Sequence, residues 1–88
     1  MIQSFASKET QAVYGGHKSL AFANIRKVLE RKLQMLDAAV LRVPPGNRLE
    51  ALAGDRVGQH SIRVNDQFRL CFRWTANGPE DVECVDYH

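Results

Sequence analysis

The chain has 88 residues and a mass of 9.9 kDa, so we expect one small domain covering residues 1–88. Hydrophobic residues make up 44%, charged residues 25% and the net charge is +2, a balance typical of folded proteins rather than disordered chains. No segment approaches the roughly 18 consecutive apolar residues of a membrane span, and the first residues lack the pattern of a signal peptide. Two cysteines, Cys71 and Cys84, are too few for a disulfide scaffold, so we expect a cytoplasmic protein.

The residues before position 20 predict a short strand and a short helix. Residues 2–5 alternate in polarity, which is compatible with an edge strand. Ser7 is a candidate N-cap for a helix over residues 8–14, because its hydroxyl can accept a hydrogen bond from a backbone N–H of the first turn. Glu9 would lie in that turn, where the helix dipole favours negative charge, and the glycine pair that follows Tyr14 ends the helix.

The clearest helical pattern covers residues 20–36. Its apolar residues recur at the spacing of an amphipathic helix, and they are Phe22, Ile25, Leu29, Leu33 and Leu36. Because charged and polar residues occupy the remaining positions, one side of this helix must pack against a sheet or another helix. The run Pro44-Pro45-Gly46-Asn47 then predicts a break, since two prolines cannot continue a helix.

After the prolines, the hydrophobic period changes from 3.6 to 2, which predicts β-strands. Strands are expected over residues 49–53, 59–64, 68–74 and 82–87, separated by turns at 54–56, 65–66 and Asn77-Gly78. A strand, two helices and then three or four antiparallel strands predict an α+β fold, because helices and strands are segregated along the chain.

Arginine is concentrated in the strand region. Between residues 42 and 73, six arginines and no lysine stand against three acidic residues, a net charge of +3. Because side chains alternate across a strand, Arg69 and Arg73 must point away from the apolar side that packs on the helices, and Arg63 is expected beside them. Three guanidinium groups on one open side of a sheet suit a phosphate backbone. The alternative is a set of solvated residues in cross-strand ion pairs.

A series of motifs makes the sequence recognisable: PPGNRLEAL (44–52), GDR (54–56), SIRVNDQ (61–67), FRW (72–74) and VDYH (85–88). With these motifs in this order, the chain resembles HigB-type toxins, the plasmid maintenance system killer proteins of the RelE/ParE superfamily, over its whole length. The resemblance implies two N-terminal helices packed on a twisted, mostly antiparallel sheet. It also implies the toxin of a type II toxin–antitoxin system, acting as a ribosome-dependent endoribonuclease that cuts mRNA in the ribosomal A site. The implied partner is a helix-turn-helix, HigA-like antitoxin that represses the operon, so that operator DNA is contacted only through the antitoxin.

RNA can be cleaved without a metal when its own 2′-hydroxyl attacks the phosphate, which requires a base, an acid and positive charge on the phosphate. No group of His, Cys or carboxylate residues has metal-ligand spacing, so we expect neither metal nor cofactor. The resemblance implies that Asp86-Tyr87-His88 belong to the active site. The imidazole of His88 is the candidate acid or base, Asp86 would orient it or act as base, and Tyr87 would stack on a nucleobase or donate to the phosphate.

Arginines and one glutamate complete the predicted site. Arg69 matches an active-site arginine of the family and is assigned to the scissile phosphate. The residues assigned to ribosomal or messenger RNA, each with a solvated charge as the alternative, are Arg48, Arg56, Arg63 and Arg73. Some relatives carry a catalytic histidine where this chain has Glu50, which is either a substitute base or one partner of a salt bridge between strands.

Two other functions remain open on the sequence. ParE relatives share the fold, act on DNA gyrase and cleave nothing, so inhibition of supercoiling without mRNA cuts would favour that interpretation. A terminal histidine argues against it, because pure binding does not require a titratable residue there. The second alternative is an attenuated, non-catalytic module whose basic segment binds an acidic antitoxin tail.

Overall fold

The computed structural model describes residues 1–38 and 49–86. Its elements, in chain order, are α1 (Lys8–Tyr14), η1 (Ala23–Ile25), α2 (Arg26–Ala38), β1 (Glu50–Ala51), η2 (Gly54–Arg56), β2 (His60–Arg63), β3 (Phe68–Thr75) and β4 (Gly78–Asp86). The four strands form one sheet in the order β1-β2-β3-β4, with every neighbouring pair antiparallel. The predicted α+β fold is therefore confirmed.

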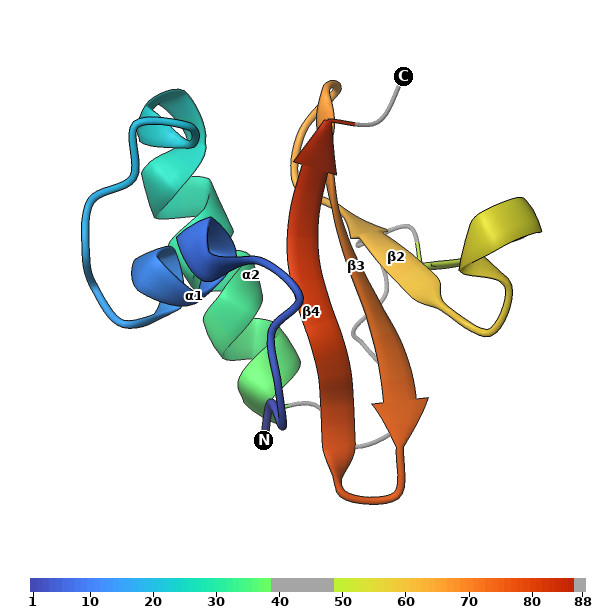
Figure 1. The fold of residues 1–88 in the computed structure, drawn as a ribbon. Helices are drawn as coiled ribbons and strands as arrows, with labels where there is room; N and C mark the ends of the chain where they lie inside the picture. The colour runs from blue at the N-terminus through green and yellow to red at the C-terminus, as the bar shows by residue number, and fades with distance from the viewer. Residues whose placement is uncertain (39–48, 87–88) are drawn as a thin grey trace.

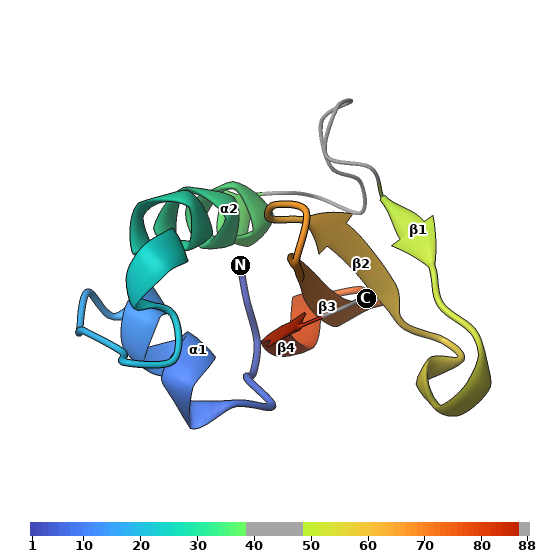
Figure 2. The same cartoon turned by 90° about the horizontal axis from the view of Figure 1, so that it is seen from above.

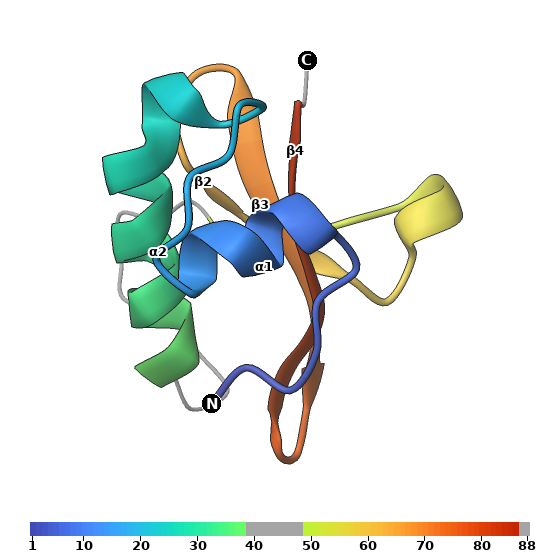
Figure 3. The ribbon, with the colours of Figure 1, turned by 60° about the vertical axis from the view of Figure 1, so that its left-hand side comes forward.

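The molecule has two layers, one of helices and one of strands. Both α1 and α2 cover the same side of the sheet, while η2 lies on the opposite side (Figures 1 and 2). Figure 3 shows α1 beside α2 and in front of the strands, with the first residues of the chain passing close to the sheet before α1 begins. None of the described helices is long and apolar enough to cross a membrane.

The core lies between α2 and the sheet. The predicted apolar stripe of the second helix is buried, with Leu29, Leu33 and Leu36 losing all contact with solvent. Leu70 and Phe72 of β3 are equally buried beneath them, as the alternation of that strand predicted. Each side chain of this size contributes about 1.5–3 kcal/mol when fully buried, so this layer is the main source of stability.

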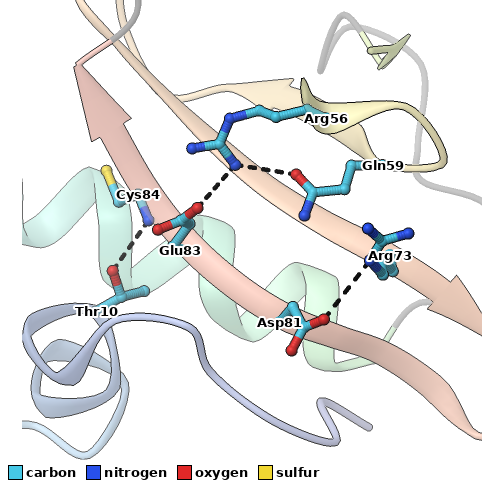
Figure 4. Close-up of polar contacts among 7 residues, drawn as sticks. All are labelled: Thr10, Arg56, Gln59, Arg73, Asp81, Glu83 and Cys84. Atoms are coloured by element: carbon cyan, nitrogen blue, oxygen red, sulfur yellow. Dashed lines mark hydrogen bonds and ion pairs between the residues drawn. The ribbon is translucent and has the colours of Figure 1, made fainter. Parts of the chain in front are cut away.

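The first helix agrees with its prediction in both bounds and cap. The Ser7 hydroxyl accepts a hydrogen bond from the N–H of Thr10 at 3.2 Å, and Gly15 follows the last helical residue. Thr10 also joins α1 to the sheet, because its Oγ1 accepts a hydrogen bond from the backbone N–H of Cys84 at 3.0 Å (Figure 4). Both residues are buried, so this bond supplies a partner for an outward-pointing N–H of the edge strand β4.

The predicted start of the second helix was wrong. A 3₁₀ turn occupies residues 23–25 and the α-helix runs from Arg26 to Ala38, so the helix begins and ends later than the predicted 20–36. Leu20, which does not share the apolar stripe, is fully exposed in the preceding loop. The stripe itself starts at Phe22, and this residue is buried although it lies before the helix. The helical spacing of the apolar residues identified the buried side chains correctly. It did not predict the 3₁₀ turn at residues 23–25.

The predicted edge strand over residues 2–5 is only a single parallel bridge, between Phe5 and Val82. The segment runs beside β4 and makes isolated backbone hydrogen bonds, for example from the N–H of Gln3 to the carbonyl of Pro79 at 2.7 Å. Residues 2–5 cannot form a regular parallel ladder beside Pro79, because proline has no N–H to donate. These residues nevertheless cover part of the outer edge of the sheet.

The remaining strands differ from their predictions mainly in length. The weakly alternating segment 49–53 contributes only Glu50–Ala51, whereas β4 begins at Gly78, four residues before the predicted start at Val82. The Asn77-Gly78 signal correctly located the β3–β4 hairpin, in which Thr75 pairs with Gly78. β4 contains a bulge, because its register with β3 shifts between Cys71 and Arg73 and Asp81 adopts a φ of 54°. The extra residue interrupts the alternation of side chains, so the pattern did not predict the first part of this strand.

Candidate functional site

The candidate site lies on the side of the sheet that faces away from α1 and α2, called here the outer side. Arg63 of β2 and Arg69 of β3 are directly opposite each other in the register, so they share one side. Because Leu70 and Phe72 point to the helices, Arg69 and Arg73 must point outward. The prediction that these arginines share one side of the sheet is confirmed.

The prediction that this side is open was wrong. The segment around η2 folds over the outer side, and Ser61 and Cys71 are fully buried there. Arg56 of η2 holds the segment down, because its Nη1 donates to Oε1 of Glu83 at 2.7 Å and to Oε1 of Gln59 at 3.0 Å (Figure 4). The alternation of apolar and polar residues could not predict that this side is covered, because the cover depends on the path of the loop around η2.

Arg73 lies at the end of the outer side next to the β3–β4 hairpin. Its Nε is 3.6 Å from Oδ2 of Asp81, the residue at the bulge of β4 (Figure 4). The backbone of Gly58 closely approaches the same guanidinium, and a Cβ added there would lie 2.9 Å from Nη1. Gly58 also has a φ of +88°, a conformation that favours glycine. Arg73 is thus packed between a loop and a carboxylate, and its side chain is 41% exposed.

Arg69 lies deeper than the other arginines of this side, with its side chain only 12% exposed. Its Nε donates to the hydroxyl of Ser61 at 2.7 Å, and its Nη2 donates to the Ser61 carbonyl at 3.3 Å. Oε1 of Glu50 lies 4.0 Å from the same Nη2, and the Glu50 side chain is 59% exposed. The structure therefore brings two predicted site residues, Arg69 and Glu50, together around a buried serine.

Arg63 is the second guanidinium of this cluster. It forms an ion pair with Asp66, three residues on, whose side chain is 98% exposed. Like charges directly opposite each other on neighbouring strands destabilise a sheet unless counter-charges compensate. Asp66 and Glu50 provide such counter-charges, and because both are exposed, either can be exchanged for an anion from solution at little cost.

The structure locates only part of the predicted chain-end triplet. Asp86 ends β4 opposite Phe68, while Val85 is the residue opposite Arg69. Oδ2 of Asp86 accepts a hydrogen bond from Nε2 of Gln67 at 3.0 Å, so the carboxylate lies at the end of the sheet near the β2–β3 turn. Tyr87, His88 and Arg48 lie outside the described residues, as does the proline run 44–47, and the predictions for them stay predictions.

The chemistry of this region is limited to a few groups. Burial raises the pKa of the Cys71 thiol, so it remains protonated and is a poor nucleophile near neutral pH. Among residues 1–38 and 49–86, no group of three or more His, Cys, Asp and Glu side chains is arranged to hold a metal ion. The groups that remain for chemistry are the oriented guanidinium of Arg69, the guanidinium of Arg63 opposite it and the exposed carboxylate of Glu50. Such a set is suited to binding a phosphodiester.

Sequence reasoning missed Ser61. The sequence offered a weak signal, since Ser61 lies in a predicted strand at the same alternation phase as Arg63. Its importance depends on the β2–β3 register, which places it diagonally from Arg69 and within hydrogen-bonding distance. Gln59 was missed for a similar reason, because it contacts Arg56 through the conformation of the η2 segment.

Comparison with known structures defines the class of fold. The YoeB–YefM complex from Staphylococcus aureus contains a chain that matches with a TM-score of 0.63, covering 100% of this chain and 98% of that one. The identity is 21%, so this likeness concerns the architecture alone. Two helices on one side of an antiparallel sheet are thus the α+β architecture that the two chains share, and it is the arrangement that the sequence resemblance implied.

Comparison of sequences assigns the family within that class. A family model described as the RelE-like toxin of type II toxin–antitoxin system HigB matches residues 3–88, and the chain belongs to this family. Toxin HigB-1 from Vibrio cholerae serotype O1 is 45% identical over 80 residues, covering 84% of each chain. An uncharacterized protein from Haemophilus influenzae is 43% identical over 68 residues, covering 73% of this chain and 67% of its own length.

Proposed function

We propose that this HigB-family toxin is a ribosome-dependent endoribonuclease that cuts mRNA by attack of the substrate 2′-hydroxyl. The observation that supports the proposal most strongly is the position of Arg69, a guanidinium held on the outer side by Ser61 with Arg63 opposite it. Negative charge builds on the scissile phosphate during cleavage, and a charge that is already oriented stabilises the transition state at little reorganisation cost.

Each step of the reaction has a candidate residue. A base removes the proton of the 2′-hydroxyl, the freed oxygen attacks the phosphorus, and an acid protonates the departing 5′-oxygen. The products are a 2′,3′-cyclic phosphate and a 5′-hydroxyl. His88 and Asp86 are the first candidates for proton transfer, with Tyr87 on a nucleobase or the phosphate. Glu50 is a further candidate base, since its exposed carboxylate lies 4.0 Å from the group assigned to the phosphate.

RNA contacts outside the reacting phosphate would come from the other arginines. Arg63 is the best placed, because its counter-ion Asp66 is almost fully exposed and a phosphate can replace it. Arg56 and Arg73 already have carboxylate partners, so RNA must compete with Glu83 and Asp81 for them. Arg48 remains an RNA-binding candidate from the sequence alone. Arginine supplies the positive charge in this mechanism, which therefore requires neither metal nor cofactor.

Partners follow from the family. The type II toxin–antitoxin assignment supports a cognate antitoxin, which we propose is a helix-turn-helix, HigA-like protein. Contact with operator DNA would then pass through the antitoxin. The ribosome and mRNA are the proposed targets, and a cytoplasmic location accompanies that proposal.

The test is cleavage of a defined mRNA on purified translating ribosomes. Wild-type protein should cut within the codon that occupies the A site, and the same mRNA without ribosomes should remain intact. His88→Ala and Arg69→Ala should each remove the cuts, with a cooperative unfolding transition showing that each variant is folded.

Two outcomes would contradict the proposal. Full activity of both variants would show that neither residue takes part in the chemistry. Absence of cuts by the wild type, together with inhibition of DNA gyrase supercoiling, would assign the protein to the ParE-like alternative instead.

A further inference from the structure

We propose that Ser61 is the positioning residue for Arg69, fixing the orientation in which its guanidinium meets the scissile phosphate. This inference rests on the proposed cleavage reaction and deepens it. Neither the sequence motifs nor the family description assigns a role to this serine.

Ser61 contacts one edge of the Arg69 guanidinium through two hydrogen bonds. Nε donates to the Ser61 hydroxyl at 2.7 Å and Nη2 donates to the Ser61 carbonyl at 3.3 Å. These two nitrogens form the side edge of the planar group, so two hydrogen bonds from one residue fix both the position and the plane of the guanidinium. Oε1 of Glu50, 4.0 Å from Nη2, is the carboxylate in that neighbourhood.

The strand register explains why a serine is needed here. Ser61 is opposite Cys71, and Arg69 is opposite Arg63, so Ser61 and Arg69 are diagonal neighbours. The Arg69 side chain therefore runs along the sheet, away from the like charge directly opposite it and toward the serine. Without the hydroxyl, Nε would lose this acceptor in a nearly dry environment, and attraction to the Glu50 carboxylate would favour a different orientation of the guanidinium.

Burial makes the hydrogen bond an effective constraint. Ser61 is fully buried and the Arg69 side chain is only 12% exposed, so water competes weakly for this contact. Ser61 belongs to a central strand paired on both sides, which fixes its backbone carbonyl as well. The hydroxyl and the carbonyl of Ser61 are thus acceptors on a rigid strand. They orient the Arg69 guanidinium, and this orientation becomes important when negative charge develops on the phosphate.

The experiment compares Ser61→Thr with Ser61→Val, which add the same volume and differ only in the hydroxyl. Single-turnover cleavage on programmed ribosomes, at several toxin concentrations, gives a maximal rate and a half-saturating concentration for each variant. We expect the maximal rate of S61V to be about tenfold to a hundredfold below that of S61T, with similar half-saturation. Ser61→Ala, which adds no volume, should show the same loss relative to the wild type if the larger variants fail to fold.

The control places the same substitutions in an Arg69→Lys background. Lysine has no Nε–H at the guanidinium position, so the rates of S61T and S61V should then differ by less than about twofold. Equal maximal rates in the chain that keeps Arg69, or an unchanged ratio in the Arg69→Lys background, would overturn the inference while leaving the cleavage proposal intact. Absence of cleavage by the wild type would overturn both.

Discussion

The two sides of the sheet are both largely buried, but by different chemistry. On the side of α2, apolar side chains such as Leu70 and Phe72 pack against a helix. On the outer side, Ser61 and Cys71 are just as buried, yet arginines, a glutamate and the η2 segment cover them. The apolar side thus provides the stability, while the outer side uses that rigid support to orient charged groups. Substitutions on the two sides should therefore affect different properties.

The largest expected effect is a loss of stability on the apolar side. Phe72 is fully buried and its ring lies 5.1 Å from that of Trp74, so Phe72→Ala removes packing on several sides at once. The free energy of unfolding should fall by about 3–5 kcal/mol, measured by urea denaturation. Phe72→Leu, which keeps most of the volume, should lose clearly less. A fall below about 1 kcal/mol for the alanine variant would contradict the assignment of this side as the core.

The next effect concerns activity on the outer side. Arg69→Ala should lower the rate of ribosome-dependent cleavage by about 10²–10³-fold, because the charge that stabilises the phosphate is removed. Arg73→Ala is the matched comparison, because Arg73 lies on the same strand and the same side but is paired with Asp81 and is more exposed than Arg69. Its cleavage rate should fall less than about tenfold, since it removes an auxiliary contact. Equal losses for the two variants would show that the outer side acts only through its total charge.

A smaller effect tests how the helical layer is joined to the sheet. Thr10→Val keeps the shape of the side chain but removes the acceptor for the Cys84 N–H. The orphaned buried N–H should cost about 1–3 kcal/mol of unfolding free energy, without a change in cleavage rate once the protein is folded. Ser7→Ala, which removes the N-cap of the same helix, provides a second measurement and should cost about 1 kcal/mol. Unchanged stability in T10V would mean that the N–H finds another partner.

Alkaline pH provides a separate test of the buried sheet. Burial raises the pKa of the Cys84 thiol from 9.0 to about 12. Above pH 9 the unfolded chain releases this proton while the folded chain keeps it, so stability falls between pH 9 and 12 by up to about 1.4 kcal/mol per pH unit. Cys84→Ala should show a shallower fall than the wild type in urea titrations at pH 8 to 10.5. Identical slopes would indicate that Cys84 ionises in the folded protein as it does in the unfolded chain.

The fold could be predicted from the sequence wherever one periodic pattern determined burial. The stripe from Phe22 to Leu36 and the alternation in 68–74 identified the helix and strand that form the core. The bounds of the helices and strands were less predictable, because they depend on competition between alternative backbone conformations at each end. The chain before α2 adopts a 3₁₀ turn, and the bulge at Asp81 shifts the alternation of β4 by one residue. Neither event leaves a distinct signature in the hydrophobic pattern.

The site was predictable only in its composition. Alternation placed Arg63, Arg69 and Arg73 on one side, but it could not show that the η2 segment covers that side or which acid accompanies each guanidinium. Those contacts join residues far apart in sequence, such as Arg56 and Glu83. The role proposed for Ser61 depends on the register between two strands, which no local pattern specifies.

The most direct test of the central claim uses an mRNA with a single 2′-deoxynucleotide at the mapped cleavage position, presented on translating ribosomes. If Arg69 stabilises a phosphate attacked by the neighbouring 2′-hydroxyl, wild-type protein should leave this mRNA intact there. The all-ribose mRNA should be cut to a 2′,3′-cyclic phosphate end. Cleavage of the deoxy-substituted mRNA at the same position and rate would contradict the account, because the attacking group would then have to come from elsewhere.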